Sequence, residues 1–465
     1  MALTITPPYP RATSQEPPAR LGPVTIPVSA TLAANETMDA RRRRGEPVLP
    51  LAFGEAGLPV HRTLRAALAR AAGFASYGPV AGHAVLREAA ARYWARRGLP
   101  TEPDSVICGP GSKALLFGLI TAIGGDVAVP RPSWVSYAAQ ASLAGRAAHF
   151  VPGAAGVPDA DHLARAVTAA RAAGNPVRSV IVTLPDNPTG RLAPAAAVRD
   201  LCSVARAHDL IVISDEIYRD LVFDPDAPFT SPAEICPERA VVTAGLSKNL
   251  ALGGWRLGVA RLPAGGPGPE LRARLLGIGS EIWSAPAGPV QQAAALAFSE
   301  PPALAERIAL SRRLHGSVAR AVARTFAAAG AAVPAPQAAF YVYPDFSPLA
   351  DALLERHGIT SDEGLARVLL GKYGVGVLPG SVFGEESGRL RLRVATSLLY
   401  GDTDAERTVA LNSADPSSLP WIAASLARLE EVLADLTGVS AQTRVLDHAP
   451  CPSGYAEHGE RGEQP

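Results

Sequence analysis

Short apolar runs alternate with longer stretches rich in alanine and leucine between about residues 60 and 300. The short runs carry β-branched side chains at consecutive positions, as in Val180-Ile181-Val182, which is typical of strands buried on both faces. The longer stretches have the length and composition of helices. Strands are predicted at 105–108, 126–129, 148–151, 179–183, 210–214, 240–243 and 257–261, and helices at 85–97, 113–123, 160–173, 194–208 and 288–299. This alternation predicts an α/β fold in which helices cover both faces of a mostly parallel, seven-stranded sheet.

The pattern changes after about residue 300, where strands and helices mix. Helices are predicted at 302–329, 363–373 and 419–436, and strands at 375–377 and 389–395, with a further apolar segment at 340–344. The mixture indicates a second, smaller α+β domain, which a helix at 30–44 and the segment 48–53 are expected to join. The predicted division is a flexible arm at 1–29, the smaller domain at 30–70 and 305–438, the large domain at 71–304, and a polar tail at 439–465.

Composition excludes several classes of function. The chain has 465 residues and a formal net charge of +1, which favours neither nucleic acid nor an acidic membrane surface as a partner. The run Arg41 to Arg44 could bind nucleic acid, but arginines that end a helix before Gly45 also interact favourably with the helix dipole. No apolar run reaches the roughly 18 residues of a membrane span, and no signal-peptide pattern precedes residue 30. Four widely spaced cysteines argue against zinc and a disulfide framework, so we expect a cytoplasmic protein without a metal.

Lys248 lies between the strand predicted at 240–243 and a glycine-rich segment, and Arg256 follows eight residues later. An amine nucleophile near a guanidinium fits an enzyme that holds an aldehyde as a Schiff base and binds its phosphate. A surface lysine in a loop is the alternative interpretation.

Two polar residues follow predicted strands directly. Asn187, in Leu184-Pro185-Asp186-Asn187-Pro188-Thr189-Gly190, comes after one strand, and Asp215 ends another. Open α/β sheets bind ligands at the carboxyl ends of their strands, where Asn187 could donate to a ring oxygen and Asp215 could pair with a protonated ring nitrogen. Tyr218 could reach the same face. The alternatives are an ordinary strand-to-helix loop for Asn187 and a helix N-cap for Asp215.

Three arginines alternate in Arg389-Leu390-Arg391-Leu392-Arg393, which puts them on one face of a strand. They could form a solvated basic edge. Alternatively, one of them, for which Arg391 is the candidate, could hold a substrate carboxylate through its planar fork of donors.

The order and spacing of these segments resemble class I/II aminotransferases, which are fold-type I enzymes that use pyridoxal 5′-phosphate (PLP). The resemblance runs from about Ala30 to Leu436. The segment 132–137, Pro-Ser-Trp-Val-Ser-Tyr, is most similar to the bacterial aspartate/prephenate aminotransferase branch. The resemblance implies a large PLP-binding domain around a mostly parallel sheet, together with a smaller α+β domain.

The resemblance also implies roles around the PLP ring. Lys248 would form the Schiff base with PLP and then transfer the proton, and Asp215 would hold the pyridinium nitrogen. Asn187 and Tyr218 would contact the ring hydroxyl, and Trp134 would stack on the ring. These roles make Lys248, Asp215 and Tyr218 the expected catalytic residues.

The phosphate and the substrate have their own implied contacts. The phosphate would be bound by residues around the start of the helix at 113–123, namely Gly111, Ser112, Lys113, Ser247 and Arg256. Tyr77 would reach the phosphate of a partner subunit in a homodimer. Arg391 would clamp the substrate α-carboxylate, with the Gly54 backbone, Asn187 and Trp134 nearby.

The chain departs from the family pattern in three places. Gly54-Glu55 is followed by Ala-Gly-Leu where the family usually has Pro-Asp-Phe, and Gly245 stands where Ser or Thr often contributes a phosphate contact. Ser76 stands where members that act on acidic substrates commonly carry a basic residue.

The resemblance implies a transaminase that moves an amino group between an L-amino acid and a 2-oxo acid. The alternative is another PLP reaction on the same fold, by a β-eliminating lyase, a decarboxylase or an oxidase. A PLP-fold transcription regulator would need a DNA-binding domain before Ala30, where only a short segment precedes.

Overall fold

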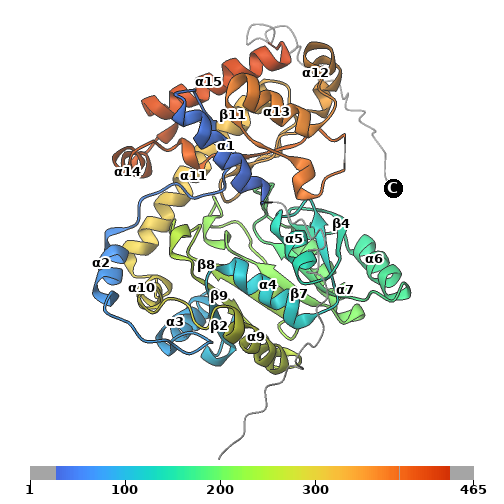
Figure 1. The fold of residues 1–465 in the computed structure, drawn as a ribbon, viewed down its shortest axis with the longest axis vertical. Helices are drawn as coiled ribbons and strands as arrows, with labels where there is room; N and C mark the ends of the chain where they lie inside the picture. The colour runs from blue at the N-terminus through green and yellow to red at the C-terminus, as the bar shows by residue number, and fades with distance from the viewer. Residues whose placement is uncertain (1–27, 387, 440–465) are drawn as a thin grey trace, which may run out of the picture.

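The computed structural model describes residues 28–386 and 388–439 (Figure 1). Residues 1–27 and 440–465 lie outside the described part, and so do nearly all of the predicted arm at 1–29 and tail at 439–465. Within the described part, no helix has both the length and the apolar character that crossing a membrane requires.

The large sheet has eight strands and contains all seven that the sequence predicts. Their order is β2 (Val106–Gly109), β9 (Gly258–Arg261), β8 (Ala240–Gly245), β7 (Ile211–Asp215), β6 (Val177–Thr183), β3 (Asp126–Arg131), β4 (Ala148–Ala154) and β5 (Val157–Pro158). β9 is antiparallel to both of its neighbours, and the short eighth strand, β5, is antiparallel to β4. All other pairs are parallel, which confirms the expected α/β class with a mostly parallel sheet.

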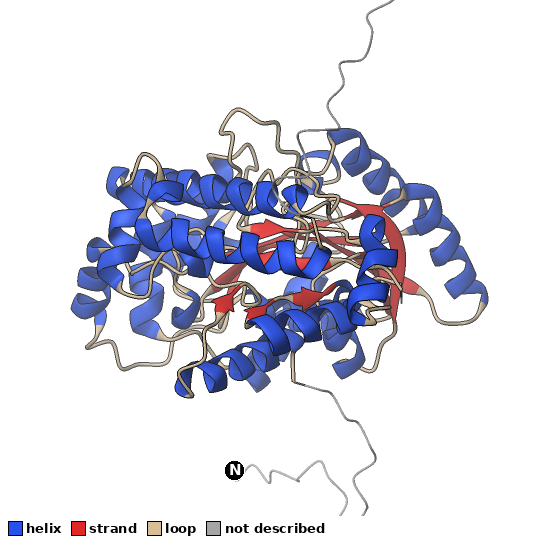
Figure 2. Ribbon diagram, turned by 90° about the horizontal axis from the view of Figure 1, so that it is seen from above, coloured by secondary structure: helices blue, strands red, loops and turns tan. Residues whose placement is uncertain are grey.

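Helices cover both faces of this sheet (Figure 2). Successive strand residues point to opposite faces, so that Val180 and Val182 pack in one core cluster and Ile181 in another. The first cluster includes residues of α3 (Ala84–Ala95), α6 (Ala160–Ala172), α7 (Ala195–His208), the short α8 (Pro232–Ile235) and α10 (Gly288–Phe298). The second includes residues of α4 (Ser112–Ile123), α5 (Ser136–Leu143) and α9 (Gly268–Ile282). Burial on both faces is the reason the middle residues of these strands, such as Val180 to Val182, are apolar.

A second core lies beside the large one, as predicted from the change of pattern. It is built from α11 (Pro302–Ala328), α12 (Ala350–His357), α13 (Asp362–Tyr373), α14 (Asp404–Asn412) and α15 (Pro420–Thr437). An antiparallel sheet of β10 (Tyr341–Val342), β13 (Leu392–Ala395) and β12 (Leu378–Pro379) packs with them. β1 (Leu49–Pro50) pairs with β11 (Val375–Gly376), and α1 (Ala30–Arg43) packs there through the buried Met38.

The packing corrects one edge of the predicted domain division. Residues 30–70 were assigned to the smaller domain, but α2 (Arg62–Ala71) packs against α10, and Leu64 belongs to the core of the large sheet. The reason is the amphipathic face of α2, whose buried residues Leu64 and Ala67 cover α10. At the other boundary, α11 serves both cores, since Leu304 and Ile308 pack in the large one and Leu314 in the small one.

Candidate active site

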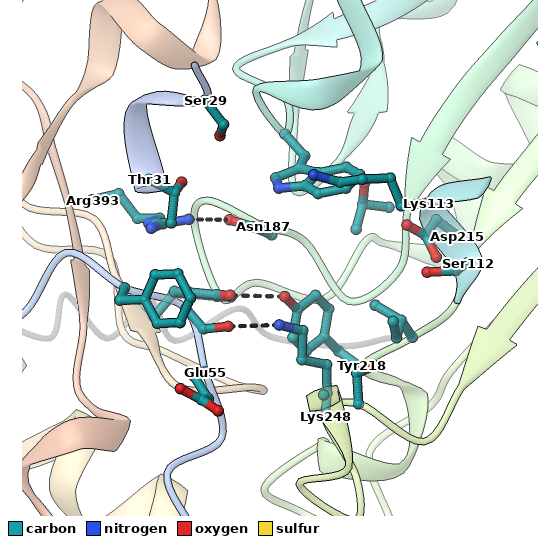
Figure 3. A pocket seen from close by; sticks show the side chains of 18 of the residues that line it. Ser29, Thr31, Glu55, Ser112, Lys113, Asn187, Asp215, Tyr218, Lys248 and Arg393 are labelled. Atoms are coloured by element: carbon teal, nitrogen blue, oxygen red, sulfur yellow. Dashed lines mark hydrogen bonds between the residues drawn. The ribbon is translucent and has the colours of Figure 1, made fainter. Parts of the chain in front are cut away.

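A cavity of about 480 Å³ opens at the carboxyl ends of β6 and β7, facing the smaller core (Figure 3). Parallel strands in register bring their ends to one edge, with Thr183 opposite Asp215 and Asp215 opposite Thr243. Ten of the predicted site residues line this cavity: Gly54, Ser112, Lys113, Trp134, Asn187, Asp215, Tyr218, Ser247, Lys248 and Arg256. The structure therefore brings together segments that are far apart in the sequence.

Asp215 is buried at the end of β7 and is held by two hydroxyl groups. Thr243 Oγ1 donates to its Oδ1 at 2.9 Å, and Tyr137 OH donates to its Oδ2 at 3.0 Å. The Tyr137 hydroxyl also shares a hydrogen bond of 2.7 Å with Thr183. Burial raises the pKa of Asp215 to about 6. A carboxylate that is costly to bury alone favours a cationic partner, such as a protonated ring nitrogen.

Lys248 lies in the turn that follows β8, and its Nζ donates to the backbone oxygen of Gly54 at 2.6 Å. Burial, together with the positive charge of Arg393, lowers the pKa of Lys248 to about 8. A larger share of the amine is therefore unprotonated near neutral pH than in an exposed lysine. This is the state that a nucleophilic lysine needs.

The other two expected ring contacts face the same space. Tyr218 shares a hydrogen bond of 2.7 Å with the hydroxyl of Tyr341, and its ring centroid lies 6.0 Å from Lys248 Nζ. Burial raises the pKa of Tyr218 well above its ordinary value, which keeps the hydroxyl protonated as a donor. Trp134 packs edge-on against Tyr137, with ring centroids 5.3 Å apart, and presents a flat apolar surface to the cavity.

Backbone N–H groups and cations converge at the start of α4. Gly111 is the N-cap at a φ of +90°, a conformation that L side chains rarely adopt. A Cβ on Gly111 would collide with the Arg256 guanidinium, and a Cβ on Gly258 would collide with the Ser112 nitrogen. The two glycines thus let Arg256 approach the free N–H groups of the helix, which is an arrangement suited to a phosphate. Burial, with the neighbouring Arg256, lowers the pKa of Lys113 at the same place.

The structure places Arg391, the candidate for the substrate carboxylate, outside the cavity. Arg391 does not line the cavity and pairs instead with Asp345 and Glu385, at 2.9 Å each. Arg393 lines it: the side chain is 1% exposed, and its Nη1 donates to Asn187 Oδ1 at 3.4 Å. Its Nε has no partner among the described residues. Alternation correctly indicates one strand face, but it does not say how far along the strand the cavity lies.

Two further expected residues lie away from the cavity. Gly111 shapes the start of α4 without lining the space itself, and Tyr77 is 94% exposed on the surface. Several lining residues were not predicted as site residues: Ser29, Thr31, Leu32, Phe53, Glu55, Tyr137, Thr183, Ile217, Gly253, Tyr341 and Arg393. The motif at 132–137 contains Tyr137, which its position next to Trp134 could have indicated. Ser29 and Thr31 carry no comparable signal, because only the packing of α1 brings them to the cavity.

These features fit PLP. A flat aromatic wall, a buried carboxylate, an amine with a lowered pKa and a cradle for a dianion surround one space. PLP has a ring face, a ring nitrogen, an aldehyde and a phosphate, and each would meet one of these groups.

Comparisons with known proteins agree with the geometry. The model of the family "Aminotransferase class I and II" matches residues 46–398. The chain is 32% identical to the aspartate/prephenate aminotransferase of Thermus thermophilus over 79% of its length and 92% of that protein. It is 34% identical to the aspartate aminotransferase of Geobacillus stearothermophilus, over 82% and 95% of the two chains. The solved structure of Thermus thermophilus aspartate aminotransferase with maleate superposes with a TM-score of 0.73 at 28% identity, covering 87% of this chain and 97% of that one.

Proposed function

The chain belongs to the class I and II aminotransferases, which use PLP, and we propose that it takes the amino group from an acidic L-amino acid and delivers it to a 2-oxo acid. The observation that carries the proposal is the set of charges around the cavity. Four cationic side chains line it, Lys113, Lys248, Arg256 and Arg393, against the two carboxylates of Glu55 and Asp215.

PLP, when bound, supplies an electron-withdrawing ring that stabilises negative charge at the substrate Cα. Lys248 would hold the cofactor through its amine, and the same amine would accept the proton from the substrate Cα. Asp215 keeps a ring nitrogen protonated by pairing with it. Tyr218 and Asn187 donate to the ring oxygen. Trp134 covers one ring face and excludes water from it.

The phosphate of PLP would bind at the start of α4. The backbone N–H groups of Ser112 and Lys113, the Ser247 hydroxyl and the Arg256 guanidinium would surround it, and Gly111 shapes the turn that presents them. Since the Lys113 backbone contributes here, its ammonium group is free for another anion. It lies 5.0 Å from the centroid of the Trp134 ring.

The substrate would bind between two cationic side chains, Arg393 and Lys113. Arg393 binds the α-carboxylate through its planar fork of donors, and Asn187 orients the guanidinium. The Gly54 backbone lies beside it. Once Arg256 and Arg393 have their anions, Lys113 is the remaining cation for a distal carboxylate. Two relatives named above are aspartate or aspartate/prephenate aminotransferases, which supports an acidic donor.

The proposed role of Lys113 in the preference for acidic donors can be tested with Lys113→Met. Loss of a charge-assisted hydrogen bond of about 1.5–3 kcal/mol should raise KM for aspartate and glutamate roughly 10- to 100-fold. KM for alanine should stay within about twofold. A wild-type protein that prefers neutral donors, or a variant that loses both substrate types equally, would contradict the proposed donor class.

Transamination itself can be separated from other PLP reactions. Wild-type protein mixed with an amino donor and no 2-oxo acid should stop after one turnover, with the amino group retained on the cofactor. Release of ammonia with continued turnover would indicate a lyase or an oxidase instead.

We also propose a homodimer in which Tyr77 reaches the phosphate end of the partner's cavity. A tyrosine that is 94% exposed, with Phe74 nearby in sequence at 40%, is costly to leave in water. Sedimentation should give twice the monomer mass, and Tyr77→Ala should lower the affinity for PLP. A monomer at micromolar concentration that binds PLP with full affinity would refute the dimer.

A further inference from the structure

A buried carboxylate outside the cavity links the two segments that carry Lys248 and Tyr218. Asp220 lies in the 3-10 turn η2 (Arg219–Leu221), two residues after Tyr218, and does not line the cavity. Its Oδ2 accepts a hydrogen bond of 2.8 Å from Nδ2 of Asn249. Asn249 directly follows Lys248 and is 6% exposed. One hydrogen bond therefore ties the lysine segment to the tyrosine segment.

Asp220 is itself held by residues in and just after helix α3. Tyr93 OH donates to its Oδ2 at 3.0 Å, and Arg97 donates to its Oδ1 through Nη2 at 2.7 Å and Nε at 3.2 Å. Arg97 also pairs with Glu300, which follows α10. With the bond from Asn249, the carboxylate accepts four hydrogen bonds, and its side chain is only 8% exposed. A carboxylate held in this way has one orientation, and it transmits that orientation to Asn249.

The backbone around Lys248 needs a contact of this kind to fix its position. Lysine has a flexible four-carbon stem, so the position of its amine depends on how firmly its backbone is held. Residues 246–250 form an irregular segment between β8 and η3 (Gly253–Trp255), and Ala251 has a φ of +57°. No strand ladder fixes this backbone. The Asn249 side chain supplies a fixed point one residue from the lysine.

We propose that Asp220 and Asn249 are positioning residues that set the place of the Lys248 amine relative to the Tyr218 hydroxyl. The inference rests on the roles proposed above for Lys248 and Tyr218. Neither Asp220 nor Asn249 touches the cavity, so both act through the segments that they hold. A shift of about 1 Å in a reacting group can lower a rate by about 100-fold, so a loose lysine would slow the proton transfer without weakening substrate binding.

The test compares Asn249→Ala and Asp220→Asn with wild type. Asn249→Ala should lower kcat by about tenfold or more, with KM for the amino donor within about twofold. Two readouts do not depend on turnover. The pH midpoint of the visible absorbance of Lys248-bound PLP should shift, and apoprotein should be trapped with PLP and cyanoborohydride more slowly at Lys248. In the Asp220→Asn background, Asn249→Ala should cause little further loss, because both act through one contact.

Asp126→Asn is the matched control. Asp126 is a largely buried carboxylate at the start of β3, away from the cavity end of the strand, and accepts hydrogen bonds from His149 and the Ala147 backbone. This variant should lose thermal stability but keep kcat, the absorbance titration and the trapping rate. If Asp220→Asn does not fold, Asn249→Ala decides alone.

Three results would overturn the proposal. Asn249→Ala with wild-type kcat, titration and trapping would show that the contact does not position the lysine. Equal changes in Asp126→Asn would show that the effect of Asn249→Ala comes from a general loss of stability. A wild type that carries no PLP on Lys248 would overturn the proposed function and this inference with it, whereas a wild type that does carry it confines any failure to the positioning role.

Discussion

Replacing Asp215 by Asn should stabilise the protein without PLP and destabilise it with PLP. The two states respond oppositely because Asp215 is a buried carboxylate, 4% exposed, whose only described donors are the hydroxyls of Thr243 and Tyr137. With PLP bound, the ring nitrogen adds the positive partner that the carboxylate lacks. Asparagine has nearly the same shape and no charge.

The magnitude follows from the pKa of Asp215, which burial raises from 3.8 to about 6. A rise of this size corresponds to about 3 kcal/mol. Since the folded pKa lies above the unfolded one, the cost of the buried charge is fully present above pH 6 and disappears below pH 3.8. At pH 7.5, apoprotein carrying Asp215→Asn should therefore gain up to about 3 kcal/mol of unfolding free energy. With PLP, loss of a charge-assisted bond should remove about 1.5–3 kcal/mol.

The assay is urea unfolding of both proteins, with and without PLP, between pH 4 and pH 8. The advantage of the variant apoprotein should shrink as the pH falls through 6. Asp126→Asn serves as the control, because that carboxylate already has a partner in the His149 imidazole as well as the Ala147 backbone N–H, so its loss should lower stability. A variant at Asp215 that destabilises the apoprotein at pH 7.5, or whose effect does not change with pH, would refute the reasoning.

Three further predictions concern Lys248, Arg393 and Gly258. The rate at which apoprotein captures PLP should rise with pH to a plateau above about 8, since burial lowers the pKa of Lys248 to that value; a stopped-flow midpoint near the ordinary 10.5 would contradict this. Arg393→Ala should raise KM for both the amino acid and the 2-oxo acid about 10- to 100-fold, while Arg391→Ala should change KM less than about twofold; equal effects would contradict the role proposed for Arg393. Gly258→Ala should weaken PLP binding at least about tenfold in equilibrium dialysis, because its Cβ would displace the Ser112 nitrogen; unchanged affinity would contradict the proposed cradle.

The sequence was sufficient for the large sheet because burial on both faces leaves a clear mark. Runs such as Val180-Ile181-Val182 are buried from both sides and carry consecutive apolar residues, and all seven predicted strands are present. Helix α9 was not predicted. It begins with Gly268-Pro269 and contains Gly277 and Gly279, and its packing on α4 outweighs that weak helical propensity.

The site was predictable where a residue's place follows from a strand end. Asp215 and Asn187 come directly after buried strands, and parallel strands bring their carboxyl ends to one edge. Arg393 was missed because a period of two cannot distinguish it from Arg391. The choice depends on Asp345 and Glu385, which lie elsewhere in the chain and pair with Arg391.

The local sequence pattern could not predict that residues at the start of α1 line the cavity. Ser29 and Thr31 line the cavity only because Met38 anchors the helix beside Leu378 and Phe383. Contacts between segments so distant in sequence depend on the packed fold. The same is true of the bond between Asp220 and Asn249.

The central claim is that Lys248 carries the cofactor, and the composition of the chain makes its test unusually clean. The whole sequence contains three lysines, Lys113, Lys248 and Lys372. Purified protein loaded with PLP should be reduced with borohydride, digested and analysed by mass spectrometry. The account predicts one phosphopyridoxyl group per chain, on the peptide that contains Lys248, and none in Lys248→Ala. A stoichiometric adduct on Lys113 or Lys372, or no adduct in a protein that binds PLP, would contradict it.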